Sequence, residues 1–233
     1  MAITQERFVE VVRELAEINR DKLDRLRTEA NEPSKRDIWT SLVRSMATMG
    51  RSAGWKGLEP PMVREPIAYE RLIELTRAQR VEIIERVLRA AKVRMAKKKA
   101  AWLAENVDIL RELGGPVVVE RRIEAATARQ HVIDLLLGFR GIGPKYARSL
   151  PVDQDHPAFR DSIAIDVRIK SIGAALGVDG RYGDVEAYYL GVAREAGLDG
   201  WLLDRLLYNF TDDVLGALVP QARTKAVLKV AQA

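Results

Sequence analysis

Apolar side chains recur at helical spacing along most of the chain. Over residues 3–30, Phe8, Val11 and Leu15 lie three or four positions apart, with charged residues between them. This spacing is typical of an amphipathic helix that buries one face. We therefore expect one long helix over this stretch, ended by the proline at position 33.

The same periodicity predicts further helices, with boundaries marked by capping residues, glycines and prolines. We expect them over 38–52, 67–75, 77–92, 96–106, 107–113, 118–126, 128–137, from 144 onward, and over 166–176, 184–196 and 199–219. The prolines and polar residues of 57–66 and 151–160 predict loops.

Only one short stretch favours a strand. Val117-Val118-Val119 is a β-branched run, but no partner strand is evident for it. The basic stretch from Gln221 to the end is expected to be frayed. The sequence as a whole therefore predicts an all-α fold.

Composition narrows the classes of function. The 233 residues contain no cysteine, which excludes disulfides and iron–sulfur clusters held by thiolates. The two histidines, His131 and His156, argue against a histidine-based metal site. The net charge of +5 suits a partner that carries phosphate.

Two further patterns bear on location. The chain has no apolar run long enough to cross a bilayer, and its start lacks a signal-peptide pattern. We expect an intracellular protein, which in a prokaryote would be cytoplasmic and associated with the nucleoid.

The most informative stretch joins two predicted helices through Gly138-Phe139-Arg140-Gly141-Ile142-Gly143. Gly141 and Gly143 suit a hairpin that needs positive φ or close approach of another backbone. Pro144 suits the first turn of the next helix, where a missing N–H costs nothing. The first N–H groups of that helix and its dipole would form a site for an anion such as a DNA phosphate.

This hairpin, continued through Lys145-Tyr146-Ala147 and followed by Asp166, resembles the helix-hairpin-helix of the base-excision DNA glycosylase superfamily (HhH-GPD). The family pattern is L-x-G-[IV]-G-x-K-x-A, with a catalytic Asp further along the chain. The clear match covers residues 130–175, and a weaker likeness extends over 36–215. The lysine points to the branch of endonuclease III and 8-oxoguanine glycosylase, although the absence of cysteine departs from cluster-bearing members.

The resemblance implies two helical lobes with the helix-hairpin-helix at the cleft between them. One lobe would comprise residues 34–150 and end in the hairpin. The other would combine residues 1–33 with 151–233 and carry the catalytic Asp.

The resemblance also assigns chemistry to two residues. Lys145 would attack C1′ of the sugar, displace the base and form a Schiff base. The helix dipole and partial burial would disfavour its charged form, so that the lysine would lose its proton more easily and could act as a nucleophile. Its alternative role is a simple phosphate contact. Asp166 would stabilise positive charge on the sugar and handle the lysine proton. Its alternative role is an N-cap, which Asp performs well.

Contacts with DNA are expected at the hairpin and near Asp166. Arg140, Arg148 and Arg168 would meet phosphates, together with the backbone at Gly141 and Gly143 and the side chain of Lys145. For arginines of this kind the ordinary alternative is a solvated surface charge.

Two further assignments come from the resemblance alone. Met46 occupies the place where the family inserts a side chain into the gap left by a flipped base, although a core methionine on an amphipathic helix fits the sequence equally well. The backbone carbonyls of Leu137, Phe139 and Ile142 match those that hold Na⁺ or K⁺ in related hairpins, and the alternative is an empty turn. The chemistry requires no other cofactor.

The sequence thus predicts a monomeric base-excision repair enzyme, a DNA glycosylase with AP lyase activity. It would flip a damaged base out of double-stranded DNA, and we expect that base to be 8-oxoguanine, with an oxidised pyrimidine as the second candidate. One alternative is a monofunctional glycosylase for alkylated bases or uracil. Another is a DNA-binding module without catalytic activity that uses the hairpin as a phosphate clamp.

Overall fold

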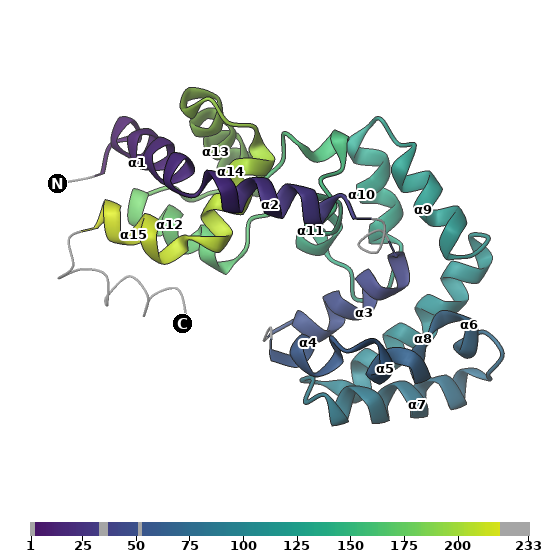
Figure 1. Ribbon diagram of the computed structural model, residues 1–233. Coiled ribbons are helices and arrows are strands. Elements are labelled where there is room, and N and C mark those ends of the chain that lie inside the picture. The colour runs from purple at the N-terminus through teal and green to yellow at the C-terminus, as the bar shows by residue number, and fades with distance from the viewer. Residues whose placement is uncertain (1–2, 33–36, 51–52, 220–233) are drawn as a thin grey trace. The chain divides into compact units, whose positions relative to one another are not determined.

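The computed structural model describes residues 3–32, 37–50 and 53–219, and within these residues it contains helices and no strand. The all-α prediction is therefore confirmed. The chain divides into two compact units (Figure 1). The terminal unit comprises Met1–Glu32 and Arg148–Ala233, and the central unit comprises Pro33–Ala147. These boundaries lie within a few residues of the predicted lobes. The basic stretch from Gln221 lies outside the described residues.

The terminal unit is built around α1, which packs against α13 and α15. Its core includes Phe8 and Tyr189, whose rings meet edge to face with centroids 6.1 Å apart. Its elements are α1 (Gln5–Ile18), α2 (Arg20–Ala30), η3 (Pro157–Phe159), α12 (Val167–Leu176), α13 (Tyr182–Ala196), α14 (Gly200–Asn209) and α15 (Thr211–Leu218).

The central unit has α7 packed along α8 as its largest helix pair. Thr76 and Gln79 form a reciprocal capping box at the start of α7, which satisfies N–H groups that a helix end leaves unpaired. The elements are α3 (Ile38–Thr48), α4 (Ala53–Leu58), α5 (Pro61–Arg64), η2 (Glu65–Ile67), α6 (Tyr69–Leu72), α7 (Arg77–Ala90), α8 (Ala96–Glu112), α9 (Pro116–Glu124) and α10 (Arg129–Leu137).

In three places the predicted number of helices was wrong. The N-terminal helix is broken at Asn19, whose side-chain amide donates to the carbonyl of Leu15 at 2.8 Å and so competes with the helix. The stretch 199–219 is broken at Phe210, which separates α14 from α15. Conversely, α8 continues through Asn106, where two helices had been expected, because the amide of Asn106 finds its partners outside the helix.

Helix also replaces the predicted strand and loops. The valine run lies in α9, where Pro116 occupies the first turn, and Val119 and Ile123, one turn apart, are both buried. The expected loop over 57–66 contains the end of α4, then α5 and η2, each of the latter two with a proline in its first turn. The helix α11 (Pro144–Asp153) includes Pro151, where a loop had been expected to begin.

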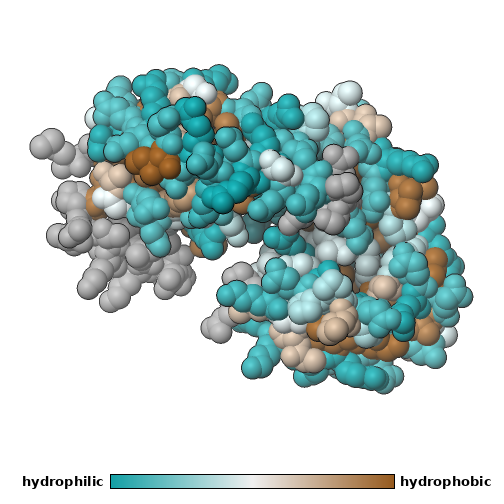
Figure 2. Space-filling model, viewed as in Figure 1, coloured by the Kyte–Doolittle hydropathy of each residue, from teal (hydrophilic) through white to brown (hydrophobic). Residues whose placement is uncertain are grey.

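The face of the molecule seen in Figure 2 is mostly hydrophilic, and its apolar residues form small separate patches. Within the ranges that the structure describes, no helix combines the length and apolar character needed to cross a bilayer.

Candidate active site

The hairpin between α10 and α11 is held from α8 by one buried side chain. The backbone N–H of Arg140 donates to Oδ1 of Asn106 at 2.7 Å, and Nδ2 of Asn106 donates to the carbonyl of Arg140 at 3.1 Å. Asn106 has no exposed surface. This pair of bonds fixes the hairpin backbone at its turn, a role that the sequence analysis missed because the partners lie far apart in the chain.

Gly141 meets one of the two conditions that were predicted for a hairpin glycine, the positive φ, and the groups packed against it are side chains and not another backbone. Its φ is +79°, in the left-handed region that favours glycine. A Cβ atom at this position would lie 2.5 Å from Cε of Met46 and 2.8 Å from Cε3 of Trp102. The turn therefore requires glycine for its conformation and for its packing.

The same packing contradicts the wedge prediction for Met46. The side chain of Met46 has no exposed surface and lies on the inner side of α3 against the hairpin. A buried side chain cannot enter DNA without opening the core of the central unit. The alternative interpretation, a core methionine that fills an irregular gap, fits the structure.

Gly143 differs from Gly141. Its φ lies outside the left-handed region, and among the described residues no heavy atom lies within 4 Å of a Cβ atom built there. No packing within the protein therefore requires glycine at this position. The open space beside Gly143 leaves room for the close backbone approach that the sequence predicted.

Lys145 lies in the first turn of α11 and is exposed. Its Nζ atom lies 4.4 Å from the centroid of the neighbouring Tyr146 ring, which is within cation–π range. Lys145 belongs to the central unit, whereas Asp166 belongs to the terminal unit.

Asp166 is the N-cap of α12. Its Oδ1 atom accepts from the backbone N–H groups of Arg168 at 2.9 Å and Ile169 at 3.1 Å. The other carboxylate oxygen, Oδ2, receives no hydrogen bond from the residues that the structure describes, and the side chain is half-buried. The cap thus occupies one oxygen and leaves the second available, so the capping role does not exclude a catalytic one.

Each of the three candidate arginines has a partner within the protein. Arg140 forms an ion pair with Glu105, and this contact lowers the pKa of the Glu105 carboxyl. Arg148 lies with its guanidinium carbon 4.4 Å from the ring centroid of Tyr182. Arg168 donates to the backbone carbonyl of Tyr208 at 3.1 Å, and its guanidinium group stacks on the ring of Tyr208. Their contact with phosphates stays a prediction.

The three carbonyls predicted to hold a monovalent cation lie where the hairpin turns. One of them, the carbonyl of Phe139, accepts a hydrogen bond from the N–H of Ile142 at 3.2 Å. A carbonyl oxygen has a second lone pair, so this bond leaves room for a cation. No cluster of three or more His, Asp or Glu side chains suited to a metal occurs in the described part of the chain.

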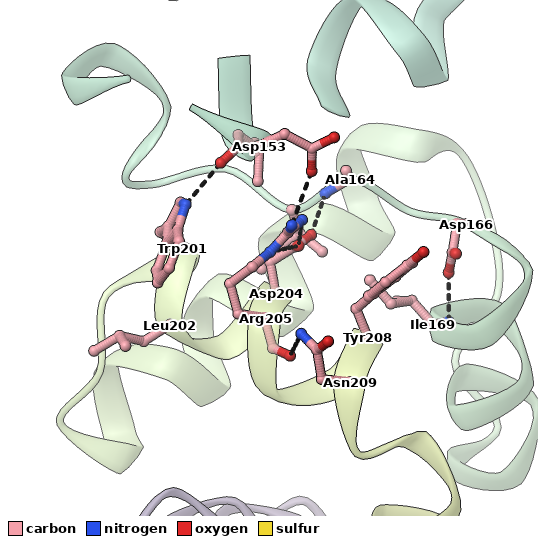
Figure 3. A network of polar contacts seen from close by, with 12 residues as sticks. Asp153, Ala164, Asp166, Ile169, Trp201, Leu202, Asp204, Arg205, Tyr208 and Asn209 are labelled. Carbon is pink, nitrogen blue, oxygen red and sulfur yellow. Dashed lines mark hydrogen bonds and ion pairs between the residues drawn. The ribbon is translucent and has the colours of Figure 1, made fainter. Parts of the chain in front are cut away.

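The segment that leads into Asp166 is anchored by a buried ion-pair network (Figure 3). Oδ1 of Asp204 accepts from the backbone N–H of Ala164 at 2.7 Å, and its Oδ2 accepts from Nε of Arg205 at 3.0 Å. Arg205 also reaches Oδ1 of Asp153 at 2.8 Å. Burial raises the pKa of the Asp204 carboxyl, while Arg205 opposes that rise.

The fold resembles solved structures of one kind of enzyme. The 8-oxoguanine DNA glycosylase of Thermotoga maritima superposes with a TM-score of 0.66 at 18% identity, over 89% of this chain and 97% of that one. The 8-oxoguanine DNA glycosylase of Methanocaldococcus jannaschii gives 0.65 at 16% identity, over 87% and 92% of the two chains.

A structure of the 8-oxoguanine glycosylase/lyase of M. jannaschii with a 15mer DNA containing 8-oxoguanine also gives 0.65 at 16% identity, over 87% of this chain and 95% of that one. Neither protein-family models nor curated proteins give a match. The chain therefore has the fold of these glycosylases, as its helix-hairpin-helix implied.

Proposed function

We propose that this chain is a base-excision DNA glycosylase with AP lyase activity that removes 8-oxoguanine from double-stranded DNA. The observations that carry the proposal are made in each unit separately: Lys145 is exposed beside a glycine hairpin, and Asp166 caps its helix through Oδ1 alone among the described residues. Both occur in a chain with the fold of 8-oxoguanine glycosylases.

In the first step, the neutral amine of Lys145 attacks C1′ of the damaged nucleotide. The C1′–N bond of the base breaks, and the base departs with the bonding electron pair and takes up a proton. Positive charge develops on the sugar as this bond breaks. The carboxylate of Asp166 stabilises that charge through Oδ2, the oxygen that the cap does not use.

The second step cuts the strand. In the C1′ adduct a proton passes from nitrogen to the ring oxygen O4′ and the C1′–O4′ bond breaks, which opens the sugar ring and gives a protonated Schiff base with Lys145. A base then removes a proton from C2′, and the C3′–O bond breaks, so that the 3′ phosphate leaves. Asp166 is the proposed acceptor for the lysine proton before the first step.

The hairpin would hold the DNA backbone. The first N–H groups of α11 and the open space at Gly143 suit a phosphate oxygen. Na⁺ or K⁺ on the carbonyls of Leu137, Phe139 and Ile142 would add positive charge beside that phosphate. We propose that one monomer binds the duplex.

The test is a panel of duplexes that each carry one lesion: 8-oxoguanine, an oxidised pyrimidine, an alkylated purine or uracil. Each is incubated with the protein, with and without borohydride. We expect strand cleavage and a covalent adduct on the 8-oxoguanine duplex. Release of another base without an adduct would indicate a monofunctional glycosylase, and binding without excision of any base would indicate a DNA-binding module.

A further inference from the structure

The segment Ser162–Ile165, directly before Asp166, is buried but belongs to no helix. Its side chains have at most 6% of their surface exposed. Buried backbone N–H and C=O groups need hydrogen-bond partners, and this segment lies in no helix whose own backbone could supply them. The partners are therefore side chains from elsewhere in the terminal unit.

Three side chains supply these partners, one for each successive N–H group. The N–H of Ile163 donates to Oε1 of Glu186 at 3.1 Å. The N–H of Ala164 donates to Asp204, as described above. The N–H of Ile165 donates to the hydroxyl of Tyr182 at 3.3 Å.

The hydroxyl of Tyr182 makes a second bond to the same segment. It donates to the carbonyl of Ile163 at 2.6 Å, so one oxygen bridges the residues on either side of Ala164. Glu186 likewise accepts from the hydroxyl of Ser162 at 2.8 Å. The backbone that ends at Asp166 is thus fixed on both its donor and acceptor sides.

This arrangement places two carboxylates, Glu186 and Asp204, in the interior, where burial of charge is costly. Their exposed fractions are 6% and 1%. Apolar residues would pack there at lower cost, but they would leave the N–H groups of the segment unpaired. The buried carboxylates are explained by a need to hold this backbone in one conformation.

We infer that Tyr182, Glu186 and Asp204 are positioning residues for Asp166. The inference rests on the proposed function of Asp166. Ile165 immediately precedes Asp166, whose own backbone is extended (ψ −172°). The three side chains fix the direction from which the chain enters the cap, and therefore where Oδ2 points.

Tyr182→Phe is the most direct variant. It removes the bridging oxygen but keeps the ring, and with it the stacking of Arg148. Tyr189→Phe is the matched control on the same helix, α13. The hydroxyl of Tyr189 is also buried and donates to the carbonyl of Ile169 at 2.9 Å. That carbonyl lies inside α12, where a helical N–H group already serves it.

The experiment compares single-turnover excision, affinity for lesion DNA and thermal melting for the two variants. We expect Tyr182→Phe to slow excision by about tenfold or more, because small misplacements of a catalytic group cost that much. Affinity should stay at the wild-type value, and Tyr189→Phe should excise normally despite a comparable loss of melting temperature. Equal excision rates for the two variants would overturn the inference.

Glu186 provides an independent check by conservative replacement. Glu186→Gln keeps an oxygen that can accept from Ile163 and should excise at close to the wild-type rate. Glu186→Leu removes the acceptor and should show the Tyr182→Phe defect. Equal activity of the Gln and Leu variants would contradict the positioning role.

Hydrogen exchange of the peptide that contains Asp166–Ile169 separates this inference from the proposed function. Tyr182→Phe should accelerate exchange there, whereas Tyr189→Phe should not. If the wild type excises no base from any duplex, the proposed catalytic role fails, and exchange alone decides whether Tyr182 orders the cap. Unchanged exchange in Tyr182→Phe would overturn the inference whatever the activity.

Discussion

The side chain of Met46 lies directly against Gly141, so that a single added methyl group at the glycine would meet Cε of the methionine at 2.5 Å. This contact joins α3 to the hairpin within the central unit. It explains why the hairpin turn cannot carry a larger residue, and why Met46 is unavailable for insertion into DNA.

The two hairpin glycines should therefore respond differently to alanine. Gly141→Ala places a Cβ atom against Met46 at a positive φ and should destabilise the fold by about 1–3 kcal/mol. Gly143→Ala meets no neighbour among the described residues and should melt like the wild type. It should nevertheless bind duplex DNA more weakly, because the methyl group fills the space proposed for a phosphate.

Thermal melting and DNA affinity, measured side by side, check both expectations. Wild-type affinity in the Gly143→Ala variant would show that the DNA backbone does not approach this glycine. Wild-type stability in the Gly141→Ala variant would mean that the hairpin can move away from Met46 without cost.

Substitutions of Asp166 should separate its effect on stability from its effect on excision. Because only Oδ1 serves the cap, Asp166→Asn should keep the cap and change the unfolding free energy by well under about 1 kcal/mol. Excision should fall by orders of magnitude, since the lost negative charge acts on the transition state. Asp166→Ala should lose both the cap and the activity. Single-turnover excision and thermal melting of both variants test these expectations. Normal excision by the Asn variant would show that Asp166 is only a structural cap.

Alkaline pH should weaken the fold through Tyr182. Burial raises the pKa of Tyr182 to about 12, whereas an exposed tyrosine has a pKa of about 10. Above about pH 10 the unfolded chain releases this proton and the folded chain retains it, so the unfolding free energy falls as the pH rises. Below that pH the contribution is fully present.

Urea unfolding measured across this alkaline range tests the assignment. Burial also raises the pKa of Tyr189, so part of the pH dependence should remain in Tyr182→Phe. The variant should show a shallower fall than the wild type. An identical pH dependence in the two proteins would place the titration elsewhere.

Local signals in the sequence predicted much of the fold because helix ends depend on neighbouring residues. Asp37 caps α3, Pro144 opens α11, Asp166 caps α12 and Gly177 ends it, each as its residue type indicates. The helix-hairpin-helix could be identified for the same reason, since its residues are contiguous.

The remaining features depend on contacts between distant residues. Asn106 looked like a helix boundary, yet its amide pairs with the hairpin backbone and the helix continues. Met46 fitted a wedge and a core position equally well until its neighbours were known. Asp204 did leave a signal, because a charged pair interrupts the apolar run Trp201–Leu207, but the sequence could not show which backbone group it holds.

The proposed function requires that Lys145 form a covalent bond with DNA. Borohydride trapping on a duplex with one 8-oxoguanine tests it, with Lys145→Gln compared against Lys98→Gln. The control variant also removes one exposed lysine that lies over an aromatic ring. Nζ of Lys98 lies 4.8 Å from the ring centroid of Trp102, and Nζ of Lys145 lies 4.4 Å from that of Tyr146. We predict no trapped adduct for Lys145→Gln and a wild-type yield for Lys98→Gln. A robust adduct with Lys145→Gln would contradict the proposed role of Lys145, because another amine would then be the nucleophile.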